Sequence, residues 1–171
     1  MASFGQRIVG AIKLDAATYE EVEADRLATT QAVAVVVLSS LAAGVGAIGL
    51  FGAAGVLRGT VSALVGWFVW ALLTYVIGTR ILPEPQTQSN LGEMLRTTGF
   101  AAAPGLFRIF TAVPLLGWLV ALVSAVWMLA AMIVAVRQAL DYTSTLRAVG
   151  VCAIGFLIYL ATALLFLPFA R

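Results

Sequence analysis

The sequence predicts an all-α polytopic membrane protein, a bundle of five transmembrane helices in a chain of 171 residues. The first reason is composition: 62% of the residues are hydrophobic and 11% are charged, against about 45–50% and about 25% in soluble domains. The second reason is that several charge-free runs reach the about 20 apolar residues needed to cross a bilayer. The third is that acids are absent between Asp25 and Glu84 and again between Glu93 and Asp141.

Residues 1–30 are more polar than the rest and are expected to form an N-terminal segment on the cytoplasmic side. Apolar residues recur there every four positions, which predicts either a short helix lying in the headgroup region or a disordered stretch. Thr18 and Glu21 have the spacing of a capping box, so a second, acidic helix is expected to start there. That helix is either a solvated lead-in to the membrane domain or a docking patch for a basic partner. The recurring apolar positions are Phe4, Ile8 and Ile12.

Residues 31–171 form the predicted membrane domain, in which charged and turn-forming residues separate the apolar runs. The first two runs are separated by Gly52–Gly59, which is expected to turn the chain around. Pro83 and Pro85 define the next loop, because proline is not tolerated in a helix interior, and polar residues around Asp141 define the last one. The five spans are predicted near 31–51, 60–79, 92–113, 116–136 and 148–167.

The third predicted span is the weakest of the five. Its beginning is amphipathic, with Asn90, Glu93 and Arg96 among apolar residues, and Pro104 interrupts the apolar run that follows. We expect one helix that enters the membrane from the interface and kinks near Pro104, before a tight turn at Pro114. A partly re-entrant third segment, which would leave four full spans, is the alternative.

The basic residues predict the orientation of the chain, because Lys and Arg near span ends stay on the cytoplasmic side. With five spans, seven basic residues share one side: Arg7, Lys13, Arg26, Arg80, Arg96, Arg137 and Arg147. The other side has Arg58, Arg108 and Arg171. The N-terminus is therefore expected in the cytoplasm and the C-terminus outside. An Ala-rich chain whose basic residues are nearly all Arg is compatible with a bacterial inner membrane.

Arg108 is the candidate site residue of the membrane domain, because it is the only charged residue between Arg96 and Arg137. Three roles are open to it. The first is snorkelling to headgroups near the outer end of the third helix, the second is binding of an anionic lipid or a partner's carboxylate, and the third is lining of an anion path. Arg96 and Arg137 are further candidates for lipid or partner contacts.

Small residues at helical spacing predict close helix packing along the second span. Gly55 and Gly59 form a GxxxG motif, and Ser62 and Gly66 continue the spacing. Small residues let helix backbones approach closely in lipid. This face is therefore expected to pack against the first span or, alternatively, against another subunit.

The composition excludes several chemistries. The chain has no histidine and one cysteine, Cys152, which excludes His-ligated metals and haem, Ser-His-Asp triads and intrachain disulfides. With no acid at membrane depth, a proton-coupled pump is not expected. Dispersed basic residues and a net charge of +2 argue against nucleic-acid binding. No catalytic, cofactor-binding or metal-binding residue is predicted.

A series of motifs in the middle of the chain carries a family resemblance. It consists of Leu91–Arg96, Gly99–Ala101, Pro104, and Pro114–Gly117 with Trp127 one helix length further on. Over roughly residues 30–165 the chain resembles Yip1-domain membrane proteins. The resemblance implies five membrane helices with a cytoplasmic N-terminus. Eukaryotic members associate with Rab GTPases, but this chain lacks their long polar N-terminal region and acidic-Gly-Pro motif, so GTPase binding is not carried over.

The sequence is compatible with three classes of function, which it favours to different degrees. The first is a non-enzymatic membrane scaffold or accessory subunit that works through helix contacts with other subunits or itself, and through residues 1–30. The second is a transporter or channel that handles a lipid or small molecule in a cavity between helices near Pro104. A membrane-bound enzyme ranks last, because no acid, base or metal set lies at membrane depth.

Overall fold

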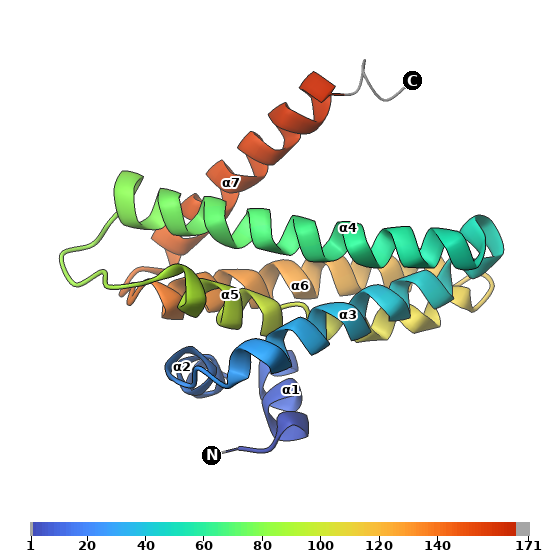
Figure 1. Cartoon of the computed structure of the whole chain (residues 1–171), viewed down its shortest axis with the longest axis horizontal. Helices are drawn as coiled ribbons and strands as arrows, with labels where there is room; N and C mark the ends of the chain where they lie inside the picture. Colours follow the sequence, from blue (N-terminus) through green and yellow to red (C-terminus); the bar gives the residue numbers. More distant parts are fainter. Residues whose placement is uncertain (1, 167–171) are drawn as a thin grey trace.

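The computed structural model of the chain is an all-α bundle, and it describes residues 2–166 with all their side chains except those of 49–51 and 162–166. Three long helices run along the long axis of the molecule (Figure 1): α3 (Ala28–Gly46), α4 (Ile48–Val76) and α6 (Gly117–Ala139). The central segment, which contacts all three, consists of α5 (Leu91–Phe100) and the 3-10 helix η2 (Ala103–Ala112). The π-helix η1 (Ile77–Ile81) extends α4, and α7 (Thr145–Phe166) leans away from the bundle (Figure 1).

Three described helices are long and apolar enough to cross a membrane: Ala28–Gly46, Gly52–Ile81 and Gly117–Ala139. They correspond to the first, second and fourth predicted spans. The described apolar part of α7, Thr145–Ala161, is shorter. It corresponds to the start of the fifth span, whose predicted end at residue 167 lies outside the described residues. The all-α fold with membrane-spanning helices is therefore confirmed, whereas the count of five stays a prediction.

The turn between the first two spans is earlier and tighter than predicted. α3 ends at Gly46 and α4 begins at Ile48, while residues 53–59, expected in the turn, are helical. Gly52 breaks the helix with a φ of 63°, a left-handed conformation that glycine adopts without a Cβ clash. The predicted turn over Gly52–Gly59 was wrong, because one glycine in this conformation is enough to redirect the chain.

The third predicted span consists of two helices rather than one. α5 ends at Phe100 and η2 begins at Ala103, so the predicted break near Pro104 is present. Its cause is steric, since a proline ring clashes with the carbonyl of the residue four positions earlier, here Phe100, and lacks a backbone N–H. η2 in turn ends before Pro114, and Leu115 takes a φ of 68° in the predicted turn.

The central segment runs in the same direction as α3 and reaches the same height. Its close approaches to α3, in order, are Gly99 to Ala32, Gly105 to Ser39 and Thr111 to Gly46. η2 covers this length with fewer residues than α3, because a 3-10 helix rises about 2.0 Å per residue and an α-helix about 1.5 Å. The far end of η2 therefore lies beside the turn between α3 and α4.

The N-terminal segment packs on one side of the bundle, against α5, η2 and α6 (Figure 1). α2 (Ala16–Ala24) lies toward the end that contains the 82–90 and 140–144 loops, where Glu20 meets Gln138, whereas Ile12 at the end of α1 (Phe4–Ile12) meets Trp127 in the middle of α6.

α1 begins at a capping box between Ser3 and Gln6, which confirms the helix expected from its apolar periodicity. Its apolar face packs on the bundle, and the rings of Phe4 and Phe100 meet edge to face at 6.4 Å between centroids. This face of α1 thus packs on protein, and contact of the helix with headgroups stays a prediction.

The second N-terminal helix, α2 (Ala16–Ala24), begins three residues earlier than the predicted N-cap at Thr18 implied. Its N-cap position is Asp15, whose carboxylate accepts a bond of 2.7 Å from the Thr18 hydroxyl. The predicted capping box of Thr18 with Glu21 was wrong. The Thr18 hydroxyl is used toward Asp15, and the Glu21 carboxylate is bound by Arg7.

Candidate functional site

A cavity of about 590 Å³ lies between α3, α4, α5, η2, α6 and α7. Its volume falls in the range of about 300–1,000 Å³ that is typical of ligand sites. The wall includes Ser39, Gly44 and Ala47 of α3; Gly59, Gly66 and Trp70 of α4; Ala102 and Arg108 of the central segment; Met128 and Met132 of α6; and Phe156 and Tyr159 of α7. The predicted site residue Arg108 is therefore part of this wall.

The cavity is elongated along the bundle, and its lining positions on α4 run from Gly55 to Trp70, which is about 22 Å at 1.5 Å per residue. Its lining positions on α3 run from Val36 to Ala47, which is about 16 Å at 1.5 Å per residue. The cavity is therefore at least as long as half of a hydrocarbon core of about 30 Å is deep. Arg108 lies at the end away from the N-terminal segment, because its backbone approaches Gly46 at the end of α3.

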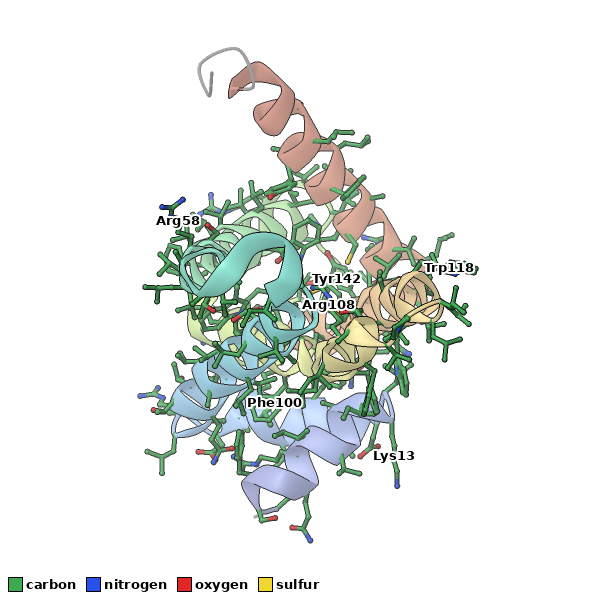
Figure 2. The ribbon with its side chains drawn as sticks, turned by 90° about the vertical axis from the view of Figure 1, so that its right-hand side faces the viewer. Lys13, Arg58, Phe100, Arg108, Trp118 and Tyr142 are labelled. Atoms are coloured by element: carbon green, nitrogen blue, oxygen red, sulfur yellow. The ribbon has the colours of Figure 1, made fainter. Side chains whose placement is uncertain are left out.

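Arg108 is the cation at the mouth of this cavity. Figure 2 looks along the bundle and shows Arg108 near its centre, whereas Arg58, at the same end, lies on its outer edge. Both side chains are exposed. Among the described residues, the ion pairs are made by Arg7 and Arg147. Neither Arg58 nor Arg108 pairs with a described acidic side chain. The predicted snorkelling, lipid-binding and anion-path roles of Arg108 all stay open at this point.

The inner end of the cavity has polar groups that are mostly satisfied within the protein. The Trp67 indole N–H donates to the Thr98 hydroxyl oxygen at 3.2 Å. The hydroxyls of Thr98 and Ser40 donate to carbonyls of their own helices at 2.6 and 2.8 Å. The exception is the indole nitrogen of Trp70, which is buried without a hydrogen-bond partner among the described residues. The Ser39 hydroxyl is a further polar group of this wall, which is otherwise mostly apolar.

The predicted packing residues of α4 mostly face this cavity. Gly55, Gly59 and Gly66 line it, and a Cβ added at Gly59 or Gly66 would meet no atom within 4 Å. Ser62 is exposed. Gly59 and Gly66 thus leave space in the wall, and the packing of this face against another helix or subunit stays a prediction.

The closest approaches between helices involve glycines outside the predicted GxxxG motif. A Cβ on Gly105 would clash with the Ser39 hydroxyl, and one on Gly46 would clash with Thr111. Both glycines bring η2 against α3. Gly46 belongs to the series of glycines that ends the first apolar run, where close packing is expected, whereas Gly105 is a single glycine that no motif singles out. The role of Gly105 becomes visible only once α3 and η2 are known to be neighbours.

Arg96 joins the N-terminal segment to the central segment. Its side chain is 6% exposed, and its Nε donates to the carbonyl oxygens of Val22 and Glu23, each at 3.0 Å. These carbonyls belong to the last turn of α2, where backbone acceptors have no partner within the helix. Arg96 therefore caps the C-terminus of α2, where a cation also complements the helix dipole. The guanidinium is thus already bonded within the chain. The contact of Arg96 with lipid or a partner stays a prediction.

Arg7 is a second buried cation at this end, and the sequence patterns did not single it out. One of its terminal nitrogens pairs with Glu21 at 2.9 Å and with Asp25 at 2.8 Å, and the other donates to Gln31 at 3.0 Å. Hydrogen bonds from Arg7 hold the pKa of both carboxyls below their usual range. Two acids of the expected docking patch for a basic partner are thus bound within the chain.

The loops at the same end meet at the buried Glu84. Its carboxylate accepts bonds from the backbone N–H and the hydroxyl of Thr143 at 3.0 and 2.8 Å, and it pairs with Arg147 at 3.3 Å. The backbone N–H of Thr143 is the main cause that lowers the pKa of Glu84. Arg137, a predicted contact residue, donates to the Tyr142 carbonyl at 3.2 Å and so fixes the same loop.

Glu23 lies where α2 meets α5 and the loop after α6. Burial raises the pKa of Glu23 to about 7, and the nearby carboxylates of Asp141 and Glu93 add to the increase. Glu20 on the same helix accepts a bond of 2.7 Å from Gln138 of α6. The contact between the N-terminal segment and the bundle therefore contains a carboxyl that titrates near neutral pH.

The fold and the site define a class: an all-α membrane protein with a cavity at membrane depth and a structured polar end. In the described part of the chain, no group of three or more His, Cys, Asp or Glu side chains could hold a metal ion. A family model of the Yip1 domain matches residues 11–165, and the chain belongs to the Yip1 family. The resemblance seen in the sequence is confirmed. No curated protein and no solved structure matches the chain significantly.

Proposed function

We propose that the protein is a non-enzymatic membrane scaffold or accessory subunit in which α7 contacts a transmembrane helix of another membrane protein. The observation that carries this proposal is the position of α7. Up to Gly155 it has buried residues and packs on α6, α4 and η1, whereas Phe156–Ala161 are exposed as the helix leans away (Figure 1). Helices in lipid associate through van der Waals packing, and on this stretch Leu157 and Leu160, 62% and 43% exposed, offer apolar side chains for it.

The five-span topology with a cytoplasmic N-terminus, in a bacterial inner membrane, belongs to the same proposal. The central segment supports the topology because it follows α3 to its far end, as a third crossing would. Basic residues gathered at the end that holds the N-terminal segment support the orientation. They include Arg26, Arg80, Arg137 and Arg147.

A photo-crosslinking amino acid placed on α7 tests the scaffold role. Leu157 is 62% exposed on α7, and Val126 is 61% exposed on α6, so the two positions form a matched pair. In cells, position 157 should give one discrete adduct with another membrane protein, and position 126 should not. The same protein should copurify with the full chain in mild detergent and be lost from a Leu157→Ala, Leu160→Ala variant. Adducts with lipid alone, or with a second copy of this chain, would contradict the accessory role.

The second function class, handling of a lipid or small molecule, is favoured by the cavity beside Arg108. The residues that line this cavity indicate the class of ligand that it would bind.

A further inference from the structure

We propose that the cavity binds one anionic phospholipid from the leaflet opposite the N-terminal segment, with an acyl chain inside and the headgroup at Arg108. The proposal goes beyond a scaffold role, because it assigns a ligand to a site contained within this chain. It can stand or fall without the α7 contact, since the two rest on different surfaces.

The depth of the cavity fits an acyl chain of one leaflet. Its wall covers about 16 Å on α3 from Val36 to Ala47 and about 22 Å on α4 from Gly55 to Trp70. One leaflet of hydrocarbon is about half of 30 Å thick, so the cavity is at least as long as one leaflet is deep. The charged residue of the wall, Arg108, lies at the end where headgroups are expected, and the indole of Trp67 lies toward the other end, where it approaches Gly99 beside Ala32. A lipid with its headgroup at the interface would thus fill the cavity along its length.

The chemistry of the wall also fits an acyl chain. Glycine and alanine on α3 and α4 leave the volume open, and Met128 and Met132 offer flexible, polarisable side chains that adapt to an irregular apolar ligand. The hydroxyls of Ser40 and Thr98 are bonded to backbone carbonyls and therefore do not need a polar ligand. The wall contains no acidic residue that would repel an anionic lipid.

The cavity is open toward the bilayer on the side of α7. Phe156 and Tyr159 line it and are still 56% and 50% exposed, because α7 leans away from α4 at this height (Figure 1). A bilayer lipid can therefore enter sideways without leaving the membrane. This opening favours a membrane lipid over a water-soluble ligand.

Arg108 supplies the preference for negative charge. A guanidinium binds phosphate oxygens through charge-assisted, often bidentate hydrogen bonds, and no described acid pairs with this one. Arg58 is exposed at the same end but does not line the cavity. Comparing substitutions at Arg108 and Arg58 therefore distinguishes lipid binding in the cavity from a general attraction of anionic lipid to this end of the protein.

Native mass spectrometry of the full chain can test the headgroup contact. The protein is incubated in detergent with phosphatidylglycerol or phosphatidylcholine of identical acyl chains, and the bound lipid is counted. Wild type should retain phosphatidylglycerol preferentially. Arg108→Ala should lower that preference about fivefold, which corresponds to about 1 kcal/mol for one cation near an anionic lipid. Arg108→Lys and Arg58→Ala should keep it, and an equal loss in Arg58→Ala and Arg108→Ala would overturn the proposal.

Filling the cavity tests the position of the acyl chain. Gly59→Leu places a side chain in open space and should lower retention of both lipids, as should Gly66→Val if the first variant fails to fold. Ser62→Leu on the exposed face of α4 is the control and should change neither. Trp70→Phe should also leave binding intact, because an acyl chain offers that N–H no acceptor. Unchanged binding in the filled variants, or loss of binding in Trp70→Phe, would overturn the assignment of an acyl chain to the cavity.

Discussion

The side chain of Arg96 donates a hydrogen bond of 3.0 Å to the carbonyl oxygen of Val22, which lies 74 positions earlier in the chain. This bond connects the last turn of α2 to the middle of α5. The N-terminal segment is thereby part of the folded bundle, and changes at Arg96 should be felt in α2.

Replacement of Arg96 by methionine should loosen the N-terminal segment. It removes the donor to two backbone carbonyls of α2, and a buried polar group left unpaired costs about 1–3 kcal/mol. Amide hydrogen exchange of residues 16–24 should become faster, while α6 stays protected. Arg26→Met, at an exposed position of the same end, is the control. Unchanged exchange of α2 in Arg96→Met would show that these bonds do not fix the segment.

Replacement of Glu23 by glutamine should remove a pH dependence of stability. Burial raises the pKa of Glu23 to about 7 from an ordinary value of 4.5. Between these values the folded protein holds the proton that the unfolded chain releases, so this group makes stability fall as the pH rises through that window and then level off. Glu23→Gln should therefore stabilise the protein at pH about 8 and change little at pH about 4.

Thermal unfolding followed by tryptophan fluorescence at both pH values measures the difference between Glu23→Gln and wild type. Glu20→Gln, on the same helix, is the control for a general loss of negative charge. The same difference at the two pH values would exclude Glu23 as the titrating group.

Alanine at Gly105 should destabilise the bundle, because the new Cβ would clash with the Ser39 hydroxyl. Overpacking of this kind costs about 1–3 kcal/mol. Ser39→Ala should restore part of the loss, which a double-mutant cycle of denaturation midpoints would detect. Gly59→Ala is the matched control, since its Cβ meets nothing within 4 Å and alanine favours a helix. Additive effects of the two substitutions would argue against direct contact.

Cysteine labelling should reveal the orientation of the two ends. In a Cys152→Ala background, Leu115→Cys lies in the turn far from the N-terminal segment, at a position 91% exposed, and Gln88→Cys lies in an exposed loop at the other end. A membrane-impermeant maleimide added to intact spheroplasts should label Leu115→Cys and spare Gln88→Cys until the cells are opened. The reverse pattern would place the N-terminus outside.

The membrane fold could be predicted because its determinants are local. Long apolar runs form helices in lipid regardless of their neighbours, since every backbone polar group has to be satisfied within the segment. The effect of Pro104 is equally local, because the ring acts on the carbonyl of Phe100 four residues earlier. Both features were therefore visible in the sequence before the helices were placed in space.

The turn at Gly52 and the packing glycines could not be predicted in the same way. Several glycines near Gly52 are equally able to adopt a left-handed conformation, and tertiary contacts decide which one does. A glycine such as Gly105 is required only because Ser39 lies opposite, on a helix far away in sequence. The cavity beside Arg108 likewise depends on six separate elements, α3, α4, α5, η2, α6 and α7, so the sequence pointed to the residue but not to the space next to it.

The winding of η2 has a consequence for the depth of Arg108. From Ala103, the first residue of η2, to Arg108, the 3-10 form is about 2.5 Å longer than an α-helix would be, at 2.0 against 1.5 Å per residue. The pitch of one short stretch, without any sliding of a whole helix, thus determines how far that guanidinium stands from the midplane.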